Sequence, residues 1–101
     1  MKVFKFGGAS VKDAAGIKNL AKIVAQEKEN LVIVVSAFGK TTNALEKVLK
    51  LWLAGEKSYK EHLDNIYSYH SGVVEELFNS GNSVGSKLDK SFTKLKKYLL
   101  S

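Results

Sequence analysis

Residues 2–8 read KVFKFGG and residues 31–36 read LVIVVS. The first segment alternates lysine with aromatic and β-branched residues and stops at two glycines, which is typical of a short strand followed by a tight turn. The second contains a continuous β-branched run of the kind found in strands that are covered on both faces. The sequence therefore predicts two β-strands, at residues 2–6 and 31–35.

The segment between the two strands has the pattern of an amphipathic helix. Ser10 to Asp13 match the start of a capping box, and a helix is expected from Val11 to Glu29. Its apolar residues recur at helical spacing, at Ile17, Leu20, Ala21 and Val24. A strand, a helix and a strand within about 35 residues make one βαβ unit, whose right-handed crossover makes the strands parallel.

Parallel strands place the loops that follow them at one edge of the sheet. Residues 6–10 and residues 36–43 are both expected at this edge. Ligands of open α/β sheets bind outside the carboxyl ends of the strands, so this edge is the predicted location of a functional site.

The chain after Asn43 has helical periodicity, in three apolar stripes separated by Gly55 and by residues 79–82. The stripes are Leu45, Val48, Leu49 and Trp52; Tyr59, Leu63, Ile66, Tyr67, Val73, Val74, Leu77 and Phe78; and Leu88, Phe92, Leu95 and Leu99. The predicted fold class is α/β, with a parallel sheet between two layers of helices. An apolar strand needs more sheet neighbours than two strands supply, so we expect the remainder of the sheet to lie outside this chain.

Composition narrows the class of protein. The chain has 101 residues, 45% of them apolar and 26% charged, which is typical of one small globular domain. It has no cysteine and no apolar secretion signal, so a cytoplasmic location is expected. Its longest apolar run, residues 31–35, is too short to span a bilayer. The net charge of +6 is spread along the chain, and neither nucleic acid nor membrane is an expected partner.

The first loop has residues suited to an anion. Lys5 lies near the strand end, Gly7 and Gly8 lie in the turn, and Ser10 lies at the expected helix start. Exposed amides at a helix N-terminus bind anions, and glycines let the backbone come close to a phosphate. The same residues also suit a plain βα turn with a capping serine, so both interpretations stay open on this segment alone.

The second loop, residues 36–43, reads SAFGKTTN and suits either a small anionic substrate or a helix cap. Its GKT resembles the end of a Walker A loop, but Val34 stands where that motif needs glycine. The GxGxxG dinucleotide motif is also excluded, because the glycines of the first loop lack its spacing. His62 and His70 are too far apart on one helix to bind a metal together, so no metal site is predicted.

Taken together, KFGGASV at residues 5–11 and VVSAFGKTTN at residues 34–43 resemble the two N-terminal signatures of aspartate kinases, in the amino-acid kinase superfamily. Ala9 departs from the threonine usual in the first signature, which removes a hydroxyl but leaves the backbone amide. The resemblance implies an incomplete N-terminal part of a catalytic domain, with the βαβ unit and both loops in residues 1–43 and a helical part in residues 44–101.

The resemblance also implies a reaction, in which the side-chain carboxylate of L-aspartate attacks the γ-phosphate of ATP, bound with Mg²⁺, to give 4-phospho-L-aspartate. This is the first step of the aspartate-family pathway, which leads to lysine and threonine. A carboxylate with a reference pKa of about 4 is already ionised at neutral pH, so no general base is needed. The implied roles are phosphoryl contact by Lys5, contact with the ATP phosphates by Lys5, Gly7, Gly8, Ala9 and Ser10, and aspartate binding by Ser36 and Thr42.

Two alternatives remain open at this point. One is another kinase of the superfamily, acting on glutamate, acetylglutamate or a nucleotide. The other is a non-catalytic interaction module that uses the basic last helix, which carries Lys87, Lys90, Lys94, Lys96 and Lys97. For a kinase, much of the substrate site would come from the remainder of the chain or from self-association, so residues 1–101 alone are expected to be inactive.

Overall fold

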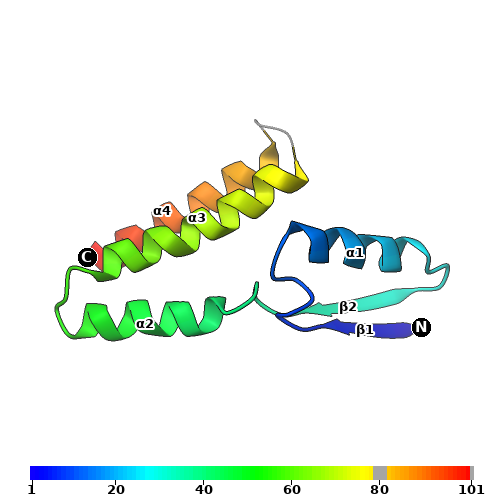
Figure 1. Ribbon diagram of the computed structural model, residues 1–101, viewed down its shortest axis with the longest axis horizontal. Coiled ribbons are helices and arrows are strands. Elements are labelled where there is room, and N and C mark those ends of the chain that lie inside the picture. Colours follow the sequence, from blue (N-terminus) through cyan, green and yellow to red (C-terminus); the bar gives the residue numbers. More distant parts are fainter. Residues whose placement is uncertain (79–81, 101) are drawn as a thin grey trace. The chain divides into compact units, whose positions relative to one another are not determined.

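The computed structural model describes residues 1–78 and 82–100, and these residues form two strands and four helices (Figure 1). The elements are β1 (Lys2–Phe6), α1 (Ala14–Ala25), β2 (Leu31–Val35), α2 (Thr41–Leu53), α3 (Tyr59–Leu77) and α4 (Ser83–Leu100). The chain divides into two compact units, residues 1–42 and residues 43–101. The predicted helix break at residues 79–82 falls largely outside the described residues.

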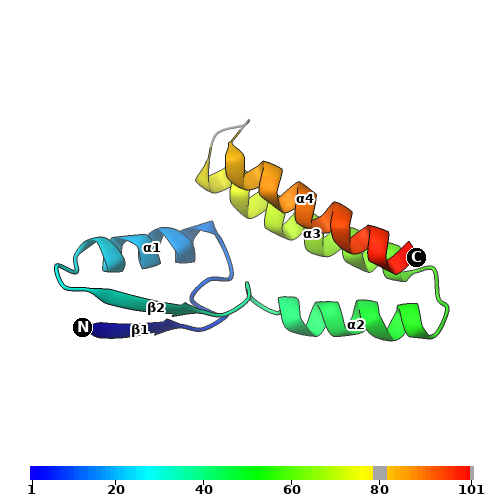
Figure 2. The ribbon, with the colours of Figure 1, turned by 180° about the vertical axis from the view of Figure 1, so that it is seen from behind.

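The first unit is a βαβ unit. β1 and β2 pair in parallel, in a register that runs from Lys2 opposite Leu31 to Phe6 opposite Val35. α1 connects the two strands and lies along them in both views (Figures 1 and 2). Two parallel strands joined by a helix are the βαβ unit that the sequence predicted. This arrangement confirms the predicted α/β fold class.

α1 is shorter than predicted, because it begins at Ala14 and ends at Ala25. Asp13, not Ser10, is its N-cap, and the carboxylate oxygen Oδ1 of Asp13 accepts a hydrogen bond from the Gly16 N–H at 2.8 Å. Ser10 instead belongs to the preceding turn, where its N–H donates to the Gly7 carbonyl at 3.0 Å. Both residues are good caps by type, and the path of the turn decides which one faces the helix.

β2 is more exposed than its apolar composition predicts. Its side chains from Val32 to Val35 are 40–49% exposed within this chain. The physical reason is that β2 pairs with one strand only among the described residues, so it is not enclosed as a central strand of a larger sheet would be.

The second unit consists of α2 from Asn43 onward, α3 and α4. Its core is formed by Val48 of α2 and by Tyr59, Leu63 and Ile66 of α3, and apolar residues of α2 and α4 pack against it, among them Trp52, Phe92, Leu95 and Leu99. α3 and α4 lie side by side in both views (Figures 1 and 2). None of the helices in the described part of the chain is long and apolar enough to cross a membrane.

Two local features hold the three helices of this unit together. Gly55 has a φ of +74°, and the N–H groups of Gly55 and Glu56 donate to the carbonyls of Trp52 and Leu51, so α2 ends in a Schellman motif at the predicted residue. The indole Nε1 of Trp52 donates to the Leu99 carbonyl at 2.8 Å, which ties α2 to the end of α4.

Candidate active site

The loops that follow β1 and β2 touch each other within the first unit. The Ser36 N–H donates to the Phe6 carbonyl at 3.0 Å, which continues the pairing of the strands past their ends. Further along, the Gly39 N–H donates to the Gly8 carbonyl at 3.3 Å. The two loops predicted to share one edge of the sheet therefore lie side by side.

Gly8 and Gly39 lie in close contact across the two loops. A Cβ atom at position 8 would lie 2.8 Å from the Gly39 carbonyl oxygen and 3.5 Å from that of Ala37. Gly39 itself has a φ of +51°, which side chains disfavour. A side chain at position 8 would therefore push the second loop away from the first. The sequence interpretation missed this role, because it considered only a tight turn and the approach of a phosphate.

The turn of the first loop offers free backbone amides. The N–H groups of Ser10 and Val11 are used by the turn, since they donate to the carbonyls of Gly7 and Gly8. Among the described residues, the N–H groups of Gly8 and Ala9 donate no hydrogen bond. A Cβ atom at Gly7 would meet no atom within 4 Å, so the space beside this exposed turn is open. Unpaired amides of a turn next to open space suit an anion.

The start of α1 contributes less to anion binding than the sequence suggested. The carboxylate of Asp13 already accepts from one of the amides of the first helical turn and brings a negative charge to the helix N-terminus. Ser10 lies four residues before the first residue of α1 and is exposed. The groups that remain open to an anion are therefore the amides of the turn itself, with the exposed Ser10 next in the chain.

Lys5 extends from the strand face that is turned away from α1. Phe4 and Phe6 alternate with it along β1, and Phe6 lines one hollow with Leu20 and Ile23 of α1, so the phenylalanines lie on the helix side. Lys5 is exposed, and no carboxylate in the described part of the chain lies within ion-pair distance of its ammonium group. The ammonium group is therefore available to an anionic ligand.

The hydroxyl groups of the second loop differ from one another. Thr41 is buried, and its hydroxyl donates to the Phe38 carbonyl at 2.5 Å, so it holds the turn that leads into α2. Ser36 and Thr42 are exposed, and within the described residues their hydroxyls form no hydrogen bond. These two hydroxyls can bind a ligand without breaking a contact of the fold.

Residues 1–91 match the Amino acid kinase family, and the chain belongs to that family. Among curated proteins it is 40% identical over 85 residues to aspartokinase 1 of Arabidopsis thaliana, which is chloroplastic, and 49% identical over 51 residues to an aspartokinase of Bacillus sp. (strain MGA3). The first match covers 74% of this chain and 14% of the relative, and the second covers 48% and 12%. The chain thus spans a small part of the length of these proteins.

A solved structure has the same fold. The aspartate kinase of Clostridium acetobutylicum superposes with a TM-score of 0.78 at 23% sequence identity, and the match covers 96% of this chain and 24% of that one. At this identity the structural likeness establishes the fold only. The similarity to aspartokinases, which the two loop segments predicted, is shown by the sequence relatives.

Proposed function

We propose that this chain is the N-terminal part of an aspartate kinase catalytic domain and supplies the phosphate loop and part of the aspartate site. The observation that carries the proposal is the direct contact of two ligand-ready loops at one edge of a parallel sheet, in a chain of the amino acid kinase family whose curated relatives are aspartokinases. The first loop presents free amides and follows the strand that carries the exposed Lys5, and the second loop presents two free hydroxyls.

The first loop would bind the phosphates of ATP. Its free amides at Gly8 and Ala9 donate to phosphate oxygens, the bare Gly7 leaves room for them, and Ser10 adds a hydroxyl. The ammonium group of Lys5 neutralises negative charge on the transferring phosphoryl group. Mg²⁺ that arrives with ATP shields the phosphate charge further. The donors present in this loop fit a polyphosphate, since all of them donate hydrogen bonds or carry positive charge.

The second loop would hold L-aspartate through the hydroxyls of Ser36 and Thr42. A carboxylate oxygen of the substrate side chain forms a bond to the γ-phosphorus, the bond from that phosphorus to the β,γ-bridging oxygen breaks, and ADP leaves with the bond electrons. The acceptor carboxylate is already ionised at neutral pH, so no proton has to be removed. Catalysis is then positioning and charge neutralisation, and the contact between Gly8 and Gly39 sets the distance between the two loops.

The test uses the full-length polypeptide that contains this segment. We expect it to form an acyl phosphate, trapped as the hydroxamate, from ATP and L-aspartate, and not from glutamate, acetylglutamate or a nucleoside monophosphate. A preference for one of those acceptors would reassign the substrate within the family. The absence of phosphoryl transfer to every acceptor, in a folded protein, would overturn the proposal.

Lys5→Ala in the same protein should lower kcat/KM by about 100-fold or more, because a charge that acts on the transferring group is lost. Lys18→Ala, which removes an equal charge from the exposed side of α1, is the matched control and should retain activity. Thermal unfolding of both variants should match that of the parent protein. Unchanged turnover in Lys5→Ala would remove Lys5 from the mechanism.

The proposed partners are the rest of the kinase chain or a second copy, because the exposed apolar side chains of β2 need further protein to cover them. The cytoplasmic location expected from composition stays a prediction, since the relative aspartokinase 1 of Arabidopsis thaliana is chloroplastic.

A further inference from the structure

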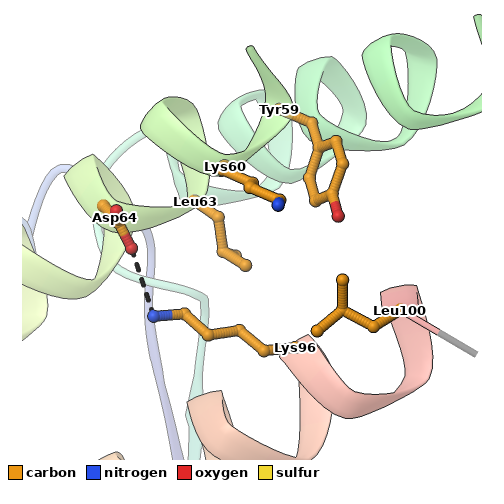
Figure 3. A pocket seen from close by; sticks show the side chains of 6 residues that line it. All are labelled: Tyr59, Lys60, Leu63, Asp64, Lys96 and Leu100. Carbon is orange, nitrogen blue, oxygen red and sulfur yellow. Dashed lines mark ion pairs between the residues drawn. The ribbon is translucent and has the colours of Figure 1, made fainter. Parts of the chain in front are cut away.

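The second unit contains a pocket between α3 and α4 that is separate from the residues of the candidate active site (Figure 3). It is lined by Tyr59, Lys60, Leu63, Asp64, Lys96 and Leu100. Both helices contribute one lysine and one leucine each, and α3 adds the tyrosine and the aspartate. The pocket therefore combines apolar and charged side chains in one place.

The apolar part of the pocket has a buried side and an exposed side. Leu63 is 1% exposed and belongs to the core of the unit, and Tyr59 is 9% exposed with its ring in the same core. Leu100 is 71% exposed and stands on the opposite side of the pocket from them (Figure 3). An apolar group that entered between Leu63 and Leu100 would remove water from the exposed Leu100 side chain and from its own surface, while Leu63 supplies a dry apolar wall.

The charged part of the pocket has one positive charge in excess. The Lys96 ammonium lies 3.2 Å from Asp64 Oδ1, so these two charges neutralise each other (Figure 3). Among the residues that the structure describes, no carboxylate lies within 4.0 Å of the Lys60 ammonium, and the Tyr59 hydroxyl forms no hydrogen bond. One ammonium group and one hydroxyl donor are therefore open to a ligand, on the edge of an apolar surface.

We propose that this pocket binds small carboxylates with an apolar body. The body lies against Leu63 and Leu100, and the carboxylate accepts hydrogen bonds from the Lys60 ammonium and the Tyr59 hydroxyl. A cation is disfavoured, because among the described residues that line the pocket the only carboxylate, that of Asp64, is already paired with Lys96. A polyphosphate is disfavoured as well, because a single excess charge beside an apolar surface does not match several negative charges.

The test is a titration of the 101-residue chain with three probes, in which the fluorescence of Trp52 reports binding. This is the only tryptophan in the sequence, and its indole donates to the carbonyl of Leu99, next to Leu100 of the pocket. Hexanoate carries both features of the ligand, hexan-1-ol carries the apolar body alone, and acetate carries the charge alone. We expect hexanoate to bind with a dissociation constant on the order of 1 mM. Hexan-1-ol and acetate should each bind at least about threefold more weakly, because each lacks one of the two contributions.

Two exposed positions separate the contributions of charge and apolar contact. Lys60→Gln should weaken hexanoate about threefold and leave hexan-1-ol unchanged, because an exposed ion pair contributes modestly. Leu100→Ser should weaken hexanoate and hexan-1-ol to a similar extent. Lys87→Gln, nine positions before Lys96 on α4, removes an equal charge away from the pocket and should change neither. Circular dichroism checks that each variant keeps its helix content.

The proposal would be overturned by equal binding of hexanoate and hexan-1-ol, which would make the site a bare apolar contact. It would also be overturned if Lys60→Gln bound hexanoate as the parent does, or if Lys87→Gln lost as much affinity as Lys60→Gln. No fluorescence or amide chemical-shift response to any probe at 20-fold the expected dissociation constant would exclude the site.

Discussion

At the residue scale, the candidate site depends on two neighbouring glycines that have different roles. Gly7 is exposed, its φ is not positive, and a side chain there would meet open space. Gly8 lies against the carbonyl groups of Ala37 and Gly39, so a side chain there would collide with the second loop. The two positions look equivalent in the sequence, and only Gly8 is needed for the packing of the loops.

Gly8→Ala should lower the free energy of unfolding by about 1–3 kcal/mol, because an inserted methyl group forces the second loop to move. Gly7→Ala is the matched control and should change it by less than about 1 kcal/mol in either direction. Urea denaturation of both variants provides the comparison. Equal stability of the two variants would show that the loops are not packed as the structure has them.

At the element scale, the beginning of α1 depends on Asp13 and not on Ser10. Asp13→Ala should destabilise the protein by about 1 kcal/mol, because the amide of Gly16 loses its partner. Ser10→Ala should change stability by less than about 0.5 kcal/mol, since its side chain is exposed and caps no helix. Urea denaturation measures both values. A larger loss of stability in Ser10→Ala than in Asp13→Ala would show that Ser10 is the cap.

A side-chain hydrogen bond joins α3 to α4 and raises the pKa of one tyrosine. The Tyr67 hydroxyl donates to Asp89 Oδ1, and this bond is the main reason that the pKa of Tyr67 is raised above its ordinary value of 10.0, with the Ser71 hydroxyl acting in the opposite direction. The bond requires the protonated phenol. Its contribution to stability is therefore fully present below the pKa of an unfolded tyrosine and is lost as the pH rises through the higher pKa of the folded state.

Spectrophotometric titration near 295 nm tests this assignment, with Tyr67→Phe used to isolate the signal of Tyr67. We expect Tyr67 to ionise at a higher pH than an unperturbed tyrosine, and Asp89→Asn to bring its pKa down toward the ordinary value, because the charged acceptor is removed. Identical titration of Tyr67 in the parent and in Asp89→Asn would show that the hydrogen bond does not control it.

At the scale of the whole molecule, the chain has an exposed apolar strand surface that further protein would ordinarily cover. The side chains of β2 from Val32 to Val35 are about half exposed, and the chain covers 14% of its Arabidopsis thaliana relative aspartokinase 1. A parallel sheet is ordinarily covered on both faces and extended by further strands. We therefore expect the proposed reaction to need groups from outside residues 1–101.

We predict that the isolated 101-residue chain releases no ADP with ATP and L-aspartate, whereas the full-length protein does. A coupled assay of ADP release measures both, at equal molar concentration and with circular dichroism to show that the isolated chain is folded. Turnover by the isolated chain at ordinary enzyme rates would contradict the prediction and would mean that both substrates are held by these residues alone.

Much of the fold could be predicted from the order of residues. Alternation in β1, the β-branched run of β2 and the apolar stripes of α3 and α4 are local patterns, and the physical periods of strands and helices convert them directly into elements. The rule that βαβ crossovers are right-handed then places the two loops at one edge without any coordinates. The resemblance to aspartate kinases rests on the same two loops.

Only the tertiary structure could show which of several similar residues is buried, caps a helix or contacts the other loop. Thr41 and Thr42 are adjacent hydroxyls, yet one is buried against Phe38 and the other is exposed, because the turn into α2 points them in different directions. Gly8 meets Gly39 across 31 positions of sequence, a contact set by the register of the two strands. Sequence by itself determined the elements and the edge at which the loops gather, since these follow from local periodicity. Burial, capping and contact between loops were decided by packing, because they depend on distances between residues that no local pattern encodes.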